Sequence, residues 1–78
     1  MNDWLSARAD ILAARGGVDR AVLELTEQEI DGLLELAGHA AHDSGARTNA
    51  PLLCYLVGLA RAGGVSLDEL DETVRSTS

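Results

Sequence analysis

An uncharged stretch from Thr48 to Ala60 constrains the fold of this chain more than any other feature. Although 24% of all residues are charged, this stretch contains a nearly continuous run of apolar side chains between Leu52 and Leu59. A helix that is apolar on almost every side has to be buried on most of them. We therefore expect a central helix over residues 50–62 to be the most buried element, with the other segments packed around it.

The remaining sequence predicts an all-α fold, because Ala and Leu are abundant and β-branched residues are few. Asn2 or Asp3 can cap a first helix, and Thr26–Glu29 and Ser66–Glu69 have the pattern of capping boxes. Residues 18–25 are ambiguous between a single helical turn and an extended connector. The prediction is a single domain over residues 1–78, a compact bundle of four helices at about 3–15, 26–42, 50–62 and 67–75.

The start and the middle of the central helix have signals of their own. Thr48 or Asn49 is expected to cap it, and Pro51 falls in the first turn, where its missing N–H is tolerated. Gly58 in the helix interior costs about 1 kcal/mol relative to Ala. The expected reason for this glycine is a neighbouring helix that crosses closely.

Charge and cysteine content exclude several classes of function. The net charge is −7, and all six basic residues are Arg, which is the opposite of the basic face needed to bind nucleic acid or an anionic membrane. A single cysteine cannot form an internal disulfide, and the N-terminus has no signal-peptide pattern. The longest apolar run is too short to span a bilayer. These features predict a cytoplasmic protein.

Two histidines on one helix face suggest a weak metal site. Glu35, His39 and His42 are spaced so that a carboxylate and two imidazoles could reach one zinc ion. The alternative is a helix end at which the imidazoles interact with the terminal carbonyl groups. Because the chain has 13 acids and only two histidines, the pattern favours the alternative, and no cofactor is predicted.

The start of the central helix suggests a weak anion site. His42, Arg47 and Asn49 surround a helix N-terminus, where free amide groups favour negative charge. The alternative is a loop arginine that holds the loop against a nearby carboxylate or helix-end carbonyl, and this alternative is favoured.

The only cysteine and the only two aromatic residues have structural interpretations. Cys54 could be a nucleophile with His42 as its base, but in so apolar a segment a small buried thiol is favoured. Trp4 and Tyr55 could anchor a partner, although core positions are favoured. Motifs for phosphate binding, dinucleotide binding and Ser-His-Asp catalysis are absent from the sequence.

The chain resembles a small helical bacterial domain of unknown function. The residues that carry the resemblance are Trp4-Leu5, the segment 33–37, Ala40-Ala41-His42, Arg47 with Pro51, and the run from Ala50 to Ala60. This domain is found alone or fused to the C-terminal side of molybdenum-cofactor guanylyltransferases. The resemblance implies an all-helical accessory module connected with the molybdenum cofactor, and it marks His42, Arg47 and Pro51.

Taken together, these features lead us to expect a non-enzymatic module that binds a protein partner or itself. A small-ligand or anion-binding module of cofactor metabolism, using residues 42–51, is the alternative.

Overall fold

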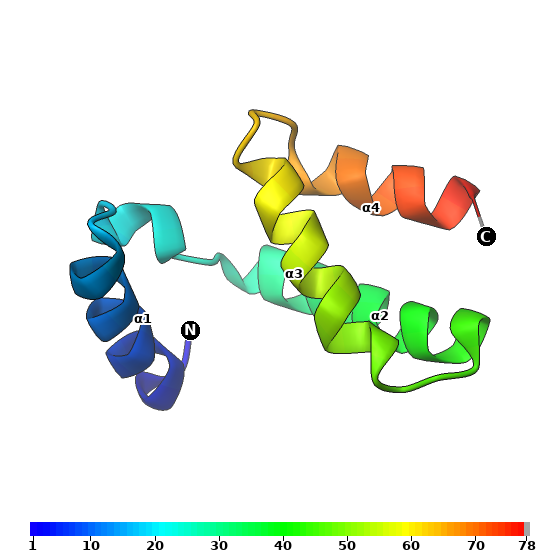
Figure 1. Cartoon of the computed structure of the whole chain (residues 1–78), viewed down its shortest axis with the longest axis horizontal. Coiled ribbons are helices and arrows are strands. Elements are labelled where there is room, and N and C mark those ends of the chain that lie inside the picture. The colour runs from blue at the N-terminus through cyan, green and yellow to red at the C-terminus, as the bar shows by residue number, and fades with distance from the viewer. Residues whose placement is uncertain (78) are drawn as a thin grey trace. The chain divides into compact units, whose positions relative to one another are not determined.

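The computed structural model describes residues 1–77, and these form an all-α structure with no strand. The four α-helices are α1 (Asp3–Gly16), α2 (Glu27–Ser44), α3 (Asn49–Arg61) and α4 (Leu67–Ser76), and a short 3₁₀ helix, η1 (Arg20–Leu23), follows α1. The predicted class, number and order of α-helices are confirmed, with ends that differ by one or two residues (Figure 1). The ambiguous segment 18–25 contains η1.

The chain divides into two compact units, Met1–Ile30 and Asp31–Ser78, of which the second is described through Thr77. Unit 1 contains α1 and η1, and unit 2 contains most of α2 together with α3 and α4. The prediction of one domain over residues 1–78 stays a prediction.

Local signals fix the helix ends as the sequence predicts at most positions. The Asn2 side chain accepts a hydrogen bond from the Leu5 amide at 2.8 Å. The first capping box is complete, because Thr26 Oγ1 accepts from the Glu29 amide at 3.1 Å and the Glu29 carboxylate accepts from the Thr26 amide at 2.9 Å. Ser66 Oγ accepts from the Glu69 amide at the start of α4.

The expected side-chain cap of α3 is wrong. Thr48 occupies the cap position in a helical conformation and makes no side-chain capping bond. Instead, the chain enters α3 through a turn in which the amides of Asn49 and Ala50 donate to the carbonyl oxygens of Ala46 and Arg47. A residue already in a helical conformation does not direct its side chain at the first free amides, as an extended N-cap residue does.

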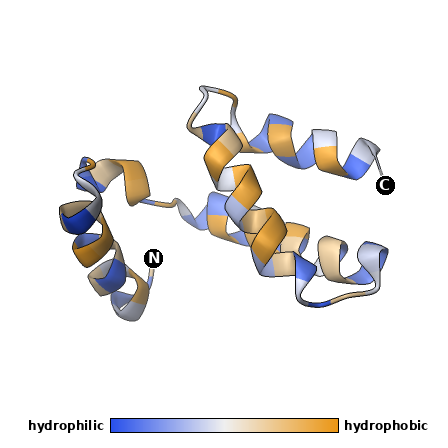
Figure 2. Ribbon diagram, viewed as in Figure 1, coloured by the Kyte–Doolittle hydropathy of each residue, from blue (hydrophilic) through white to orange (hydrophobic). Residues whose placement is uncertain are grey.

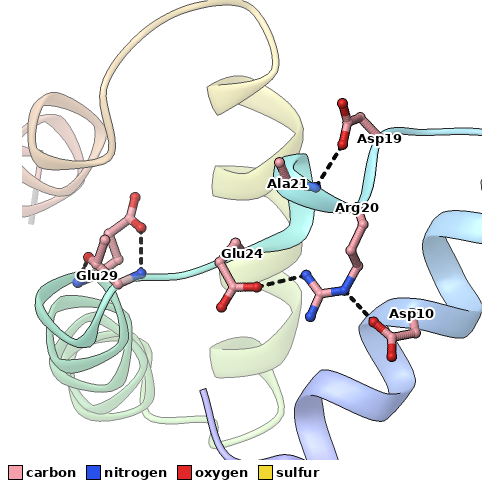
Figure 3. Close-up of polar contacts among 7 residues, drawn as sticks. Asp10, Asp19, Arg20, Ala21, Glu24 and Glu29 are labelled. Atoms are coloured by element: carbon pink, nitrogen blue, oxygen red, sulfur yellow. Dashed lines mark hydrogen bonds and ion pairs between the residues drawn. The ribbon is translucent and has the colours of Figure 1, made fainter.

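Unit 1 is held together by small residues and one arginine. Ala9 and Ala13 of α1 are buried, and α1 contacts η1. Arg20 donates to Asp10 at 2.6 Å and to Glu24 at 2.9 Å, which ties η1 to α1 (Figure 3). The hydrogen bond to Asp10 is the main cause that raises the pKa of Arg20. By contrast, Trp4 is 64% exposed, so the core position favoured for it is wrong.

Unit 2 contains the largest buried side chain of the chain. Leu36 of α2 is 1% exposed, with Ala40 on the same helix face, and Val57 is the buried residue of α3. The helices α3 and α4 contact each other, and both follow α2 in a connected three-helix arrangement (Figure 1). Leu67, Leu70 and Val74 of α4 are half-buried, as their inward spacing predicts.

The prediction that residues 50–62 form the most buried helix is wrong. Tyr55 is 68% exposed, and three leucines of α3 are more than half exposed, namely Leu52, Leu56 and Leu59. Figure 2 shows apolar residues along most of α3. The side of α3 that carries Val57 is buried, and the opposite side is exposed.

The expected close crossing at Gly58 is also wrong. No heavy atom other than the local helix backbone lies within 4 Å of the position that a Cβ would occupy there. This glycine therefore lowers helix stability without a compensating contact in the chain.

We predict that Gly58→Ala raises the free energy of unfolding by about 1 kcal/mol, because Ala is the better helix former and meets open space. Urea denaturation followed by far-UV circular dichroism measures the change. Gly45→Ala is the matched control, since it also meets open space but has a φ of 71°, and it should destabilise the protein. A loss of stability in Gly58→Ala would contradict the open surroundings of this position.

Candidate functional site

The candidate site is a groove in unit 2 with a volume of about 410 Å³. Three helices line it: α2 gives His39, Ala40, Asp43 and Ser44, α3 gives Asn49, Leu52, Leu53 and Leu56, and α4 gives Val74. Its lining is mainly apolar, and its polar residues come from the end of α2 and the start of α3. A concave, mostly apolar surface with a few polar groups is the usual form of a binding site.

The end of α2 shapes one rim of the groove. Ser44 Oγ donates to the Ala40 carbonyl oxygen at 2.6 Å, and the Ala46 amide donates to Ser44 Oγ at 3.3 Å. Gly45 then has a φ of 71°, a left-handed conformation that glycine adopts without strain. These features end α2 and turn the chain into α3, so that Asn49 comes to the same groove as His39.

Next to the groove, α3 presents an exposed apolar stripe. We define the α3 surface as Leu52, Tyr55, Leu56 and Leu59, whose spacing of three and four residues places them on one helix face. Their exposed fractions lie between 55% and 68%. Leu52 and Leu56 belong both to the α3 surface and to the groove, so the two form one continuous surface.

The residues predicted for an anion site are only partly brought to the groove. Asn49 lines it, whereas His42 and Arg47 are exposed and are not among its lining residues. Asp43 contributes a carboxylate to the same rim. A negative group at the rim opposes the binding of an anion there.

The proposed metal ligands are not assembled into a metal site. Within residues 1–77, no group of three His, Cys, Asp or Glu side chains is placed to hold a metal ion. His39 is half-buried and lines the groove, whereas Glu35 and His42 are exposed. The zinc hypothesis for these three residues therefore gains no support from the geometry, and we do not carry it further.

Cys54 is a free, half-buried thiol. Burial raises its pKa, which lowers the thiolate fraction at neutral pH. Because the thiolate is the reactive form, this environment disfavours a nucleophilic role. Cys54 also lies outside the residues that line the groove.

Two residues of unit 2 show how far the sequence indicates burial. The spacing of Leu36 from Leu33 and Ala40 indicates the buried face of α2, and Leu36 is 1% exposed. Tyr55 was placed in the core, whereas it is the most exposed member of the α3 surface. A long apolar run predicts that a helix has an apolar face, but it does not predict which part of that face the same chain covers.

Comparison with known protein families shows that residues 1–78 match DUF6457, a domain of unknown function. The chain belongs to this family, which agrees with the resemblance to a small uncharacterised domain. No curated protein and no solved structure matches. In residues 1–77, no helix is both long and apolar enough to cross a membrane.

Proposed function

We propose that this protein is a non-enzymatic helical interaction module, and that it binds a protein through the α3 surface and the adjoining groove. The observation that supports this proposal most strongly is the exposure of four large apolar side chains on one helix face. Contiguous apolar surface of this kind is typical of protein–protein contacts. An apolar face beside a groove suits a partner that presents a helix.

The charge pattern supports the same function. The net charge of −7 disfavours nucleic acid, and the sequence contains no recognised catalytic motif. From the single cysteine we also infer that the module works in the cytoplasm. From the resemblance we infer that it serves proteins that handle the molybdenum cofactor. A molybdenum-cofactor guanylyltransferase is therefore the first partner to be tested with the purified chain.

We predict that a photo-crosslinking amino acid in place of Tyr55 forms adducts with protein in an extract of the source cells. The same amino acid in place of Leu34 is the matched control, because both positions are 68% exposed but Leu34 lies on α2, outside the α3 surface and the groove. Mass spectrometry of the adducts identifies the partner as this chain or another protein. An absence of adducts at position 55, or equal adducts at both positions, would contradict the proposed function.

A small-ligand function is a second candidate, and the groove supports it. Its volume of about 410 Å³ lies in the range of ligand pockets, and His39 and Asn49 add hydrogen-bonding groups to an apolar lining. The carboxylate of Asp43 makes this rim less suited to an anion, so the protein-binding function is favoured.

For the second candidate we predict that molybdopterin or a guanine nucleotide shifts the backbone amide resonances of the groove residues, which include His39, Asn49 and Leu53. Nuclear magnetic resonance titration measures these shifts, and inorganic phosphate at the same ionic strength is the control. Shifts that are absent, or that lie on α1, would exclude this function.

A further inference from the structure

We propose that the α3 surface is the contact between two copies of this chain, related by a two-fold axis. The inference rests on the proposed function, since it names the partner of the same surface. In a two-fold contact the same patch lies on both sides, so the patch must be complementary to itself. The following observations favour a second copy over another protein.

The distribution of charge singles out α3 as the helix suited to self-contact. It has no acidic residue, whereas α1 carries two and α2 carries five. The helix α4 carries four, namely Asp68, Glu69, Asp71 and Glu72. In a chain with a net charge of −7, a two-fold contact through any other helix would oppose carboxylates. A basic partner would instead be attracted to the acidic helices and would gain no electrostatic attraction from α3.

The α3 surface has most of the area that a specific dimer requires. Its four side chains are between 55% and 68% exposed. When such side chains are covered, each loses roughly 100 Å² of accessible surface, which is about 400 Å² for each copy. A specific interface buries about 500 Å² or more for each partner. The half-buried Leu53 in the adjoining groove adds further apolar surface.

The arrangement of ridge and groove suits helix-to-helix packing. Leu52 and Leu56 form a ridge one turn apart on α3, and both also border the groove. Helices usually associate by packing the ridge of one helix into a groove of the other, and this surface offers both a ridge and a groove. Tyr55, the largest exposed side chain of α3, is the expected anchor, because tyrosine is enriched among residues that dominate binding energy.

Sedimentation equilibrium of the full chain over about a hundredfold range of concentration tests this inference. The expected result is a reversible monomer–dimer equilibrium, and Tyr55→Glu should raise the dissociation constant by about 30-fold or more. Leu34→Glu is the matched control, since Leu34 is also 68% exposed but lies across α2 from the groove. It should leave the equilibrium unchanged.

Far-UV circular dichroism checks that each variant retains its helices, and Leu59→Gln is the second variant should Tyr55→Glu unfold. A monomeric wild-type chain at every concentration would overturn the inference, and so would a dimer that both α3 variants leave intact. Either result leaves the proposed function standing if crosslinking at position 55 yields another protein. If position 55 forms crosslinks neither to this chain nor to another protein, both the inference and the proposed function are contradicted.

Discussion

Burial of apolar surface is the main force available to stabilise a small domain, and in this chain it is concentrated in few and mostly small side chains. Among residues 1–77 the buried apolar residues are Ala9, Ala13, Leu36, Ala40 and Val57. Alanine buries little surface, so Leu36 and Val57 contribute most of this stabilisation. By contrast, Leu52, Tyr55, Leu56 and Leu59 of α3 are each more than half exposed. Side-chain caps therefore add to the stability of α1, α2 and α4, and the most apolar helix is left largely exposed.

Those caps explain why the helix boundaries could be predicted so closely. Thr26 and Glu29 bond to each other over three residues, and Asn2 and Ser66 each bond an amide three residues ahead. Such interactions are local, so the sequence alone contains all the groups that make them. The cap of α3 was not predicted, because its start depends on the turn through Ala46 and Arg47 and not on a side chain.

The exposure of α3 could not be predicted in the same way. Apolar content indicates that Tyr55 and Leu56 gain free energy when water is removed from them, but the contact that removes it can come from the same chain or from another. The crossing expected at Gly58 is absent for the same reason, because the sequence does not show whether a neighbouring helix belongs to the same chain. The groove is likewise a property of tertiary packing, because it brings His39, Asn49 and Val74 together from three helices. His42 and Arg47, which the sequence marked, lie outside it.

In the isolated monomer the α3 surface is open to solvent. Methyl resonances of a leucine-labelled sample, recorded at low protein concentration with a soluble paramagnetic gadolinium complex, test this claim directly. The structure predicts strong broadening of the Leu52, Leu56 and Leu59 methyl signals and little broadening of the Leu36 signal, in line with exposures of 61%, 59% and 55% against 1%. Methyl groups of α3 that stay as sharp as those of Leu36 would show that the chain covers this surface itself, and would contradict the account.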